Sequence, residues 1–555
     1  NRPLKAEEDH PYDNLNKTYY RDQINKVALA IKEIITALKN ESLRPEKLPN
    51  RDLEAKPAPE KNLRTKIIIG AVIFFSLLTA GLFIVPKLLK PSETLEKSVA
   101  VLPFVNLSND PEQEYFIEGV VEAILNHLFK VGDLKVISST STKRYKNTNL
   151  PIKEIARELG VSSILEGSVQ KIGNNVRITT QLIDAKTDTH LWSEIYDRDI
   201  SDIFVIQSEV AQNVAMELKA KLTSEEKEQI GKNYTNNTDA YNLYLQGRYF
   251  WYRRTKEDLA RSVEYFEKAI AIDPDYALAY AGLADAYFIQ AYWGWLSWDE
   301  GTAKSRELAL KALEIDKNLA EGHTVLGAIL NYRDWNWEEA QKELQLAVNL
   351  NPKFVTAHHY YSELLDILGE NDKARTHINL ALEIDPFLPV LHALSSGYYY
   401  NDGKLKESLD ECFILQELDP EYANRTVFWR KFFIYVKQNE DLKAMESLQK
   451  ALYFDTLNIE KSNSIRDIYG KDGMNGVLKW LIEHELKKSK PSYLTLARIF
   501  AMLGNKDAVL DCLEKAFENP PPNIARINND PDLENLRSDK KFQELIIKLG
   551  LSEYQ

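Results

Sequence analysis

The chain has 555 residues, which is too long for one hydrophobic core and suggests about three or four domains. Its hydrophobic content of 44% and charged content of 28% are ordinary for a folded protein and argue against wholesale disorder. The formal net charge of −13 argues against a general nucleic-acid binder, because phosphate binding needs clustered Lys and Arg side chains.

The two cysteines, Cys412 and Cys512, have no neighbours at the spacings of metal-binding or redox motifs. This excludes a disulfide framework, although a single bridge between the two stays open. Cysteines without such neighbours usually pack as small apolar side chains, and we expect both to be buried in this way.

Residues 1–41 contain one amphipathic helix, because apolar residues between Tyr19 and Lys39 recur at helical spacing. Since the chain starts at Asn1 rather than Met, we interpret this segment as the C-terminal remnant of a cytoplasmic domain. The stretch from His10 to Gln23 resembles the closing segment of bacterial TIR-like signalling domains. This resemblance brings no catalytic residue with it.

A linker and an apolar stretch follow. Residues 42–64 contain four prolines among charged residues, which is typical of a solvated linker. The stretch from Ile67 to Val85 contains no charge and is long enough to cross a bilayer as a helix. We therefore predict a transmembrane helix within residues 65–89. A cleaved signal peptide is disfavoured, because the stretch lies far from the start of the chain.

The charges that flank this stretch predict its orientation. The basic residues are Arg51, Lys56, Lys61, Arg64 and Lys66 before it, and Lys87, Lys90 and Lys97 after it. The positive-inside rule therefore favours a cytoplasmic N-terminal side, with residues 90–555 on the opposite side of the membrane.

Residues 97–222 alternate between apolar strands and helices, which is typical of a compact α/β domain with a mixed sheet. Strands are predicted at 98–104, 134–138, 163–171, 176–184 and 190–197, and helices at 112–130, 152–159 and 203–222. The sequence Gly173-Asn174-Asn175 predicts a hairpin turn, because it favours positive φ. After this turn Val176, Ile178 and Leu182 alternate with polar residues, so one face of the sheet should be buried.

Two blocks of this domain resemble a known family: SVAVLPFVNLSNDPEQEYFIEGVVEAIL from Ser98, and ILEGSVQKIGNNVRITTQLIDAKTDTHLWSEIYDRDISDIF from Ile164. They resemble the TolB N-terminal-like (FlgO-like) domain of bacterial proteins that join a cytoplasmic signalling module, a membrane span and tetratricopeptide repeats. The resemblance implies a non-enzymatic, extracytoplasmic domain, and hence a single-pass protein of the bacterial cytoplasmic (inner) membrane.

The loop from Asn106 to Asp110 follows the first strand, where open α/β sheets bind ligands. It lacks the glycines of a phosphate-binding loop, and Asp110-Pro111 is expected to cap the next helix instead. The possibility that this domain senses a small solute stays open.

A motif exemplified by ALEIDPFLPVLH recurs through the second half of the chain. Pro352, Pro386 and Pro420 follow one another at intervals of 34 residues, and a fixed period of this length indicates a solenoid of helix pairs. Proline ends the second helix of each pair, because it cannot donate to the preceding turn. Small residues such as Gly247 and Gly282 are expected where neighbouring helices approach closely.

This pattern resembles the tetratricopeptide repeat over residues 238–522, with residues 523–555 as a C-terminal cap. The resemblance implies an all-α solenoid that binds a protein or peptide segment in the groove lined by the first helix of each repeat. Aromatic and Arg side chains are typical interface anchors. The candidate partner-binding residues are Tyr244, Arg248, Tyr249, His358, Tyr361, His392 and Tyr399.

Two features of the repeats have competing interpretations. The tryptophans form either a local aromatic core or an exposed partner site: Trp293, Trp295, Trp298, Trp335 and Trp337. The adjacent His358 and His359 suggest a metal site, but neighbouring residues on a helix point about 100° apart, so we expect no metal there.

The sequence contains no nucleotide-binding loop, metalloprotease motif or catalytic triad, so we expect no catalytic site, cofactor or metal in these residues. It predicts a multidomain protein: a transmembrane helix, an α/β mixed-sheet domain and an all-α repeat solenoid. Its expected function is that of a membrane-anchored protein-interaction or signalling scaffold without affinity for nucleic acid. The alternative is the regulatory or sensory half of a larger signalling enzyme, whose TIR-like or cyclase-like N-terminal domain would be missing here.

Overall fold

The computed structural model describes residues 97–554 except 109, 111–112 and 457–458. The predicted remnant, the linker and the apolar stretch from Ile67 to Val85 lie outside the described residues. Among the helices of the described part, none is long and apolar enough to cross a membrane. Membrane anchoring therefore stays a prediction.

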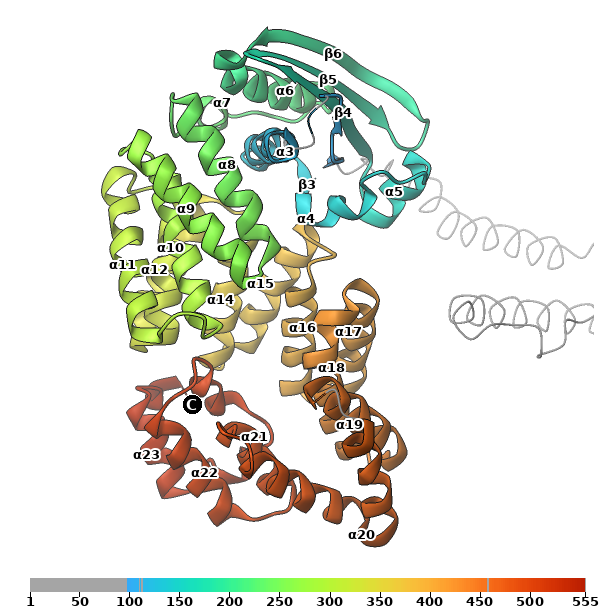
Figure 1. The fold of residues 1–555 in the computed structure, drawn as a ribbon, viewed down its shortest axis with the longest axis vertical. Helices are drawn as coiled ribbons and strands as arrows, with labels where there is room; N and C mark the ends of the chain where they lie inside the picture. The colour runs from blue at the N-terminus through green and yellow to red at the C-terminus, as the bar shows by residue number, and fades with distance from the viewer. Residues whose placement is uncertain (1–96, 109, 111–112, 457–458, 555) are drawn as a thin grey trace, which may run out of the picture. The chain divides into compact units, whose positions relative to one another are not determined.

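A six-stranded mixed sheet forms the first part of the described chain (Figure 1). Its strands are β1 (Ser98–Val101), β2 (Val105–Asn106), β3 (Lys135–Ile137), β4 (Ser163–Ile172), β5 (Asn175–Asp184) and β6 (Thr189–Asp199). The order is β3–β1–β4–β5–β6, and the short β2 pairs with β4. β1 runs parallel to β3 and β4, whereas β4, β5 and β6 form an antiparallel meander. The sheet is mixed, as the sequence predicts.

The helices of this domain are α3 (Glu114–Phe129), α4 (Ser139–Thr142), α5 (Ile152–Leu159), α6 (Ile203–Glu217) and α7 (Ser224–Gly231). α3 and α6 pack on one face of the sheet, where Val176, Ile178 and Leu182 are fully buried, as their alternation predicts. The β4–β5 hairpin turns at Gly173, whose φ of 59° is the left-handed conformation that glycine adopts without strain. α5 packs with Ala100 and Ile164, which point to the opposite face.

Helix pairs make up the rest of the described chain. Their bounds are α8 (Thr238–Arg253), α9 (Lys256–Ile272), α10 (Ala277–Tyr292), α11 (Trp298–Ile315), α12 (Ala320–Ile329), α13 (Trp337–Leu350), α14 (Val355–Ile367), α15 (Asn371–Ile384), α16 (Pro389–Asn401), α17 (Leu405–Leu418), α18 (Pro420–Lys437), α19 (Asp441–Thr456), α20 (Ile459–Leu486), α21 (Tyr493–Met502), α22 (Lys506–Glu518) and α23 (Lys540–Lys548). Where a second helix meets an Asp-Pro or Asn-Pro step, it ends immediately before that step, because proline cannot continue it.

Small residues in the first helices admit large side chains from the helices packed against them. A Cβ atom on Gly247 would lie 2.6 Å from the ring of Phe266, and one on Gly282 would lie 2.8 Å from the same ring. A Cβ on Gly327 would lie 2.6 Å from Leu344. These positions therefore hold glycine because an aromatic or aliphatic side chain fills the space of a methyl group.

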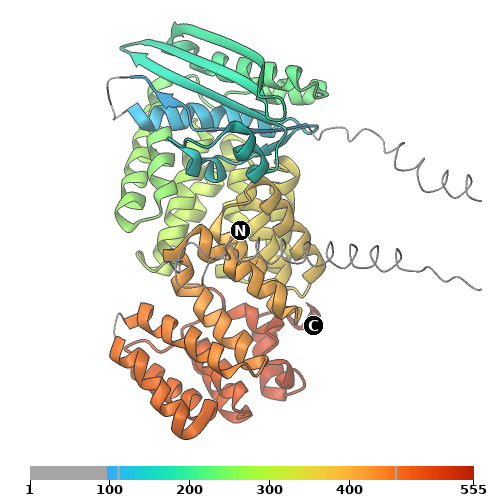
Figure 2. The same ribbon diagram turned by 90° about the vertical axis from the view of Figure 1, so that its right-hand side faces the viewer.

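The α/β domain packs directly on the repeats. Figures 1 and 2 both show α3 between the sheet and the first helix pairs. The hydroxyl of Ser141, in α4, donates to the Asp385 carboxylate at 2.5 Å, and the Ser138 N–H donates to the Ile384 carbonyl at 2.8 Å. Lys353 donates to the carbonyl of Leu134 at 2.6 Å and also to that of Val131. Loops between repeats therefore hold the end of α3 and the start of α4.

The tryptophans do not form one cluster. Trp293 and Trp295 meet edge to face with ring centroids 4.8 Å apart, in the loop that lengthens the second repeat. Trp298 packs on Phe288. In the third repeat, Trp335 contacts Phe517, and the indole of Trp337 donates to the Leu549 carbonyl at 2.8 Å. The last two thus fix the C-terminal end of the chain, a role that neither sequence interpretation assigned to them.

Cys412 and Cys512 are both buried and form no disulfide within the described residues. Burial raises the pKa of the Cys412 thiol, whose sulfur lies 3.3 Å from the Ser396 hydroxyl. Burial also raises the pKa of Cys512, to about 11. Both thiols are therefore protonated near neutral pH and pack as apolar side chains, as the sequence predicts.

Candidate partner-binding site

The first helices of the early repeats line a cavity that α3 closes from the other side. Its volume is about 150 Å³. The repeats contribute Tyr244, Arg248 and Tyr249 from α8, together with Leu278 from α10 and Glu321 from α12. Three of the seven residues predicted to bind a partner thus share one cavity, because Arg248 and Tyr249 lie about one helical turn after Tyr244.

The predicted residue His392 lies inside its own repeat and is 7% exposed. Its Nδ1 lies 2.6 Å from the Glu411 carboxylate, and its Nε2 lies 2.9 Å from the Pro386 carbonyl. In an earlier repeat, His323 makes the same two contacts with Glu343 and the Lys317 carbonyl. These histidines join the two helices of a repeat and its preceding turn, which gives them a structural role.

His358 occupies the equivalent position in its own repeat, but its ring faces another histidine. Its Nε2 lies 2.9 Å from the Pro352 carbonyl, and its Nδ1 lies 2.9 Å from Nδ1 of His377. The carbonyl requires a donor at Nε2, so Nδ1 of His358 accepts from His377. Burial lowers the pKa of both, that of His377 to about 4, and both rings are neutral at pH 7. The neighbouring His359 lies 3.2 Å from Glu363 instead.

Two predicted tyrosines lie elsewhere in the repeats. Tyr361 is 5% exposed and packs on His377 with ring centroids 4.6 Å apart. Tyr399 is half-buried on α16. Neither lines the cavity. The structure therefore brings together the predicted residues of α8 and leaves His358, Tyr361, His392 and Tyr399 apart from them.

A polar chain crosses the cavity wall from α8 to α3. Arg248 donates to the Tyr252 hydroxyl at 2.8 Å, which donates to Glu122 at 2.9 Å. The other carboxylate oxygen of Glu122 accepts from Ser139 at 2.6 Å. Desolvation alone would lower the pKa of Arg248, but nearby Tyr252, Tyr244 and Glu122 raise it, so the guanidinium stays charged. Both oxygens of Glu122 are thus engaged, whereas the Arg248 guanidinium has more N–H groups than its bond to Tyr252 uses.

Two carboxylates beside Arg248 are not paired. Apart from its own backbone N–H, the side chain of Glu321 has no hydrogen-bond partner among the described residues, and burial raises its pKa. Asp285, which lines a smaller hollow beside Arg248 and Glu321, has a buried Oδ1 without a partner in the same part of the chain. Burial also raises the pKa of Asp285, against the opposing charges of Arg254 and Arg248. This region therefore carries charges of both signs that attract one another but form no ion pair among the described residues.

The later repeats differ, because the chain's own C-terminal segment covers their first helices. Arg526, in the short helix Ile524–Asn529, pairs with the buried Glu363 of α14. Asn528 donates to the Ile367 carbonyl at 2.9 Å. Asp532 accepts from the Tyr400 hydroxyl of α16 at 2.8 Å.

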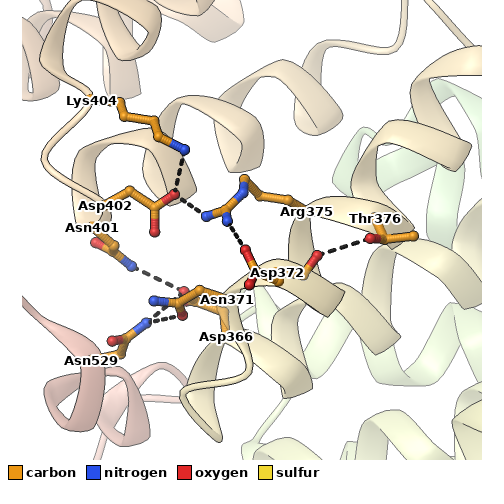
Figure 3. Close-up of polar contacts among 9 residues, drawn as sticks. All are labelled: Asp366, Asn371, Asp372, Arg375, Thr376, Asn401, Asp402, Lys404 and Asn529. Carbon is orange, nitrogen blue, oxygen red and sulfur yellow. Dashed lines mark hydrogen bonds and ion pairs between the residues drawn. The ribbon is translucent and has the colours of Figure 1, made fainter.

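Figure 3 shows how the segment continues this contact. The Asn529 amide donates to Asp366 at 3.2 Å and to Asn371 at 2.7 Å, and Asn401 donates to the same Asp366 oxygen at 3.0 Å. A partner could reach these side chains only by displacing the segment, whose Ile524 and Ile527 are buried. The C-terminal segment therefore leaves α8, α10 and α12 uncovered, and α3 of the α/β domain lies against α8 instead.

Sequence reasoning missed Glu122, Glu321 and Arg526. Glu321 stands in the first turn of a first helix, so the repeat pattern could have placed it on the groove side. Glu122 and Arg526 act across contacts between distant parts of the chain, and no local pattern signals them. Within the described ranges, no group of His, Cys, Asp and Glu side chains is placed to hold a metal ion.

Two family models match different parts of the chain. Residues 252–276 match the tetratricopeptide repeat model. The helix pairs are tetratricopeptide repeats. Residues 95–213 match a different model, the second domain of HilA/YgeH-like transcriptional regulators. The resemblance of this domain to TolB N-terminal-like domains is therefore not confirmed, and neither is the TIR-like resemblance.

Two curated relatives cover different lengths of the chain. Putative adenylate cyclase 3 of Rhizobium meliloti (strain 1021) is 36% identical over 245 residues, which are 44% of this chain and 41% of that protein. Transcriptional regulator HilA of Salmonella typhimurium is 23% identical over 290 residues, which are 52% of this chain and 51% of that protein. The chain thus spans about half, or less, of the length of these relatives.

Solved repeat proteins share the helix pairs at low overall similarity. YrrB, described as a TPR protein with an unusual peptide-binding site, is 20% identical with a TM-score of 0.28 and covers 37% of this chain and 99% of its own. A thermophilic TPR protein of Thermus thermophilus is 21% identical with a TM-score of 0.28 and covers 33% and 92%. TolB of Acinetobacter baumannii reaches a TM-score of 0.17 at 17% identity, covering 22% and 28%. Scores this low carry no functional argument.

Proposed function

We propose that the chain is a membrane-anchored interaction or signalling scaffold whose repeats hold a protein partner. Tetratricopeptide repeats are interaction modules and are typically not catalytic. The observation that carries the proposal is the cavity between α8 and α3, where Tyr244 and Tyr249 flank a charged Arg248. Aromatic and Arg side chains in a desolvated hollow are the usual anchors of an interface.

The position of the partner follows from what the chain already covers. The C-terminal segment contacts the first helices α14 and α16 through Glu363 and Tyr400, and these helices are closed to a second occupant. Arg248 and Glu321, which form no ion pair among the described residues, lie on the earlier first helices α8 and α12. A complementary partner segment would supply the counter-charges that these two partly buried groups lack.

A capture experiment tests the proposal. The tagged full chain is recovered from its source cells, and co-purifying proteins are quantified for the wild type, Arg248→Lys and Tyr249→Ala. We expect both variants to lose the same partner by at least about tenfold, as for a typical interface anchor. Tyr453→Ala, an exposed tyrosine on α19, is the matched control and should retain it. Equal recovery by all four proteins would refute partner binding at this cavity.

The anchoring part of the proposal rests on the apolar stretch Ile67–Val85 and its flanking charges. We place residues 90–555 on the extracytoplasmic side of a bacterial cytoplasmic membrane. Alkaline phosphatase fused after Gln555 should be active and membrane-bound in this topology. A fusion that is active only as a cytoplasmic reporter would overturn the orientation, and one recovered away from membranes would overturn the anchor.

A second candidate function is favoured by one relative. The identity of 36% to a protein named putative adenylate cyclase 3 is consistent with these residues serving as the regulatory or sensory half of a larger signalling enzyme. The product of the whole gene would then form cyclic AMP, at a rate that changes when Arg248 is replaced. If the whole product makes none, this candidate fails while the scaffold proposal stands.

A further inference from the structure

The cavity between α3 and α8 has the dimensions of a small-molecule site. Its volume of about 150 Å³ is comparable to cavities that hold one small ring. α3 closes one side with Ala123, Asn126 and His127, and the repeats close the other with Tyr244 and Leu278. The space lies at the junction of two domains, which is a preferred location of ligand sites.

Tyrosine rings form much of the wall. Tyr234, Tyr244 and Tyr249 line the cavity with Leu278, and burial raises the pKa of Tyr234 and of Tyr244, the latter to about 12. These two phenols are therefore neutral and can donate. The rings suit an aliphatic or aromatic body and also favour a cation above the ring face.

Side chains of both charge signs line the cavity, and several of them already have ion-pair or hydrogen-bond partners. Lys232 pairs with Asp316 at 2.8 Å, and Lys130 donates to the Gln229 carbonyl at 2.6 Å. Glu122 accepts from Tyr252 and Ser139. Partners among the described residues already satisfy these groups, so they need no ligand.

Arg248 and Glu321 differ from these groups. Both line the cavity, and they attract each other, since Arg248 opposes the rise in pKa that burial imposes on Glu321. They nevertheless form no ion pair in the described part of the chain. Two partly buried, opposite charges that line one small space without pairing are arranged for a ligand that carries the complementary charge at each end.

A third group supports a ligand in this space. His127 lines the cavity and is 7% exposed, and its Nδ1 is buried without a hydrogen-bond partner among the described residues. Burial lowers the pKa of His127 to about 3, so the imidazole is neutral and offers a polar contact without charge. Buried polar atoms are normally satisfied, so this nitrogen, on a residue of the cavity wall, is one that an occupant could satisfy.

Ligands of other charge types fit less well. A phosphate-bearing anion would meet the carboxylates Glu122 and Glu321, and a simple amine would meet Arg248 and Lys130. A purely apolar molecule would leave Arg248 and Glu321 desolvated and unpaired. Only a molecule with both a positive and a negative group satisfies the two charges together.

We infer that this cavity binds a small zwitterion of the α-amino-acid class, with its ammonium group at Glu321, its carboxylate at Arg248 and its side chain among the tyrosines. The ligand contacts α3 on one side and α8 and α12 on the other, so its binding stabilises the contact between the α/β domain and the repeats. The inference rests on the proposed function in that it uses the same cavity, where a free amino acid and a side chain of the partner compete for Arg248 and Glu321.

The full chain, purified in detergent, tests this with the twenty amino acids as individual probes at millimolar concentration in thermal-unfolding assays, followed by calorimetric titration of the strongest. We expect at least one to raise the Tm in a saturable manner. If leucine is the ligand, isopentylamine and 4-methylpentanoate, which each lack one charge, should bind at least about tenfold more weakly. A full set of probes without effect, or equal binding of the singly charged analogues, would overturn the inference.

Variants separate this result from the partner proposal. Glu321→Gln keeps the shape of the side chain and should weaken amino-acid binding at least about tenfold, whereas Glu314→Gln, exposed on α11, should not. Unchanged binding by Glu321→Gln would contradict the assignment. Partner capture is measured in parallel: if capture persists and no amino acid binds, only this inference fails, and if amino acids bind without partner capture, only the partner proposal fails.

Discussion

His392 shows how a side chain that looks like an interface anchor serves the repeat itself. Burial would lower its pKa, but the hydrogen bonds to Glu411 and to the Pro386 carbonyl outweigh burial and raise it. Both contacts are acceptors, so the doubly protonated ring satisfies them best. Aromatic and His residues at helical spacing therefore identify the first helix without distinguishing its exposed side chains from its clamps.

We expect His392→Leu to lower the free energy of unfolding by about 1–3 kcal/mol, because it leaves Glu411 and a carbonyl without their partner. Urea unfolding measures this, with the exposed His190→Leu as control. Because the pKa of His392 is higher in the folded state, this group stabilises the fold below about pH 6.5, the ordinary pKa of histidine. The contribution is lost as the pH rises through the folded-state pKa. The difference between wild type and variant should therefore shrink from pH 6 to pH 8.5, and a constant difference would refute the charged clamp.

Asp385 gives a second test at the same scale. Burial raises its pKa to about 6, although hydroxyl donors led by Ser141 oppose the rise. Stability from this group is therefore fully present below about pH 4 and is lost as pH rises through about 6. Asp385→Asn keeps the acceptor for Ser141, as Asn351 occupies the equivalent position one repeat earlier.

The variant should therefore flatten the fall in Tm between about pH 4 and pH 7 while leaving the value at pH 4 nearly unchanged. Differential scanning fluorimetry at several pH values measures this. The exposed Asp275→Asn should retain the wild-type profile. A variant whose pH profile matches the wild type would show that Asp385 does not titrate in this range.

At the scale of elements, the C-terminal segment decides which first helices stay open. Arg526 is the charge partner of the buried Glu363 and, against desolvation, lowers the pKa of that carboxyl to about 2. We expect Arg526→Met to lower the free energy of unfolding by about 3–5 kcal/mol, because it removes the main charge partner of a buried carboxylate, which keeps only His359 and the Tyr332 hydroxyl. Urea unfolding measures this, and the exposed Arg537→Met should change little.

Adding Glu363→Gln to Arg526→Met removes the buried charge that has lost its main partner and should restore part of the lost stability. A double variant less stable than Arg526→Met alone would contradict the assigned pairing.

The elements themselves were largely predictable, whereas their long-range contacts were not. Alternation of Val176, Ile178 and Leu182 predicted the buried face of β5, and the proline period predicted where second helices end. The docking of Arg526 on Glu363 joins positions 163 residues apart, and periodicity reports only on neighbours along the chain. For the same reason Tyr244, Arg248 and Tyr249 could be proposed from one helix, while Glu122, which lies in the other domain, could not.

At the scale of the described chain, the α/β domain and the repeats depend on one another. Lys353 donates to two carbonyls at the end of α3, and burial lowers its pKa to about 8. We expect Lys353→Met to increase amide hydrogen exchange at the end of α3 and in β3, because both carbonyls lose their donor. Exchange in β5 should not change. Lys342→Met, on the exposed face of α13, is the control, and an unchanged α3 in Lys353→Met would show that this contact contributes little.

The central claim is that the partner binds over α8 and not over the later repeats, which the chain covers with its own segment. A photo-crosslinking residue placed at Tyr249, or alternatively at Tyr399, in the full chain tests this directly in the source cells. We predict a specific adduct from position 249, lost on Arg248→Lys, and none from position 399. An adduct from position 399 without one from position 249 would contradict the account.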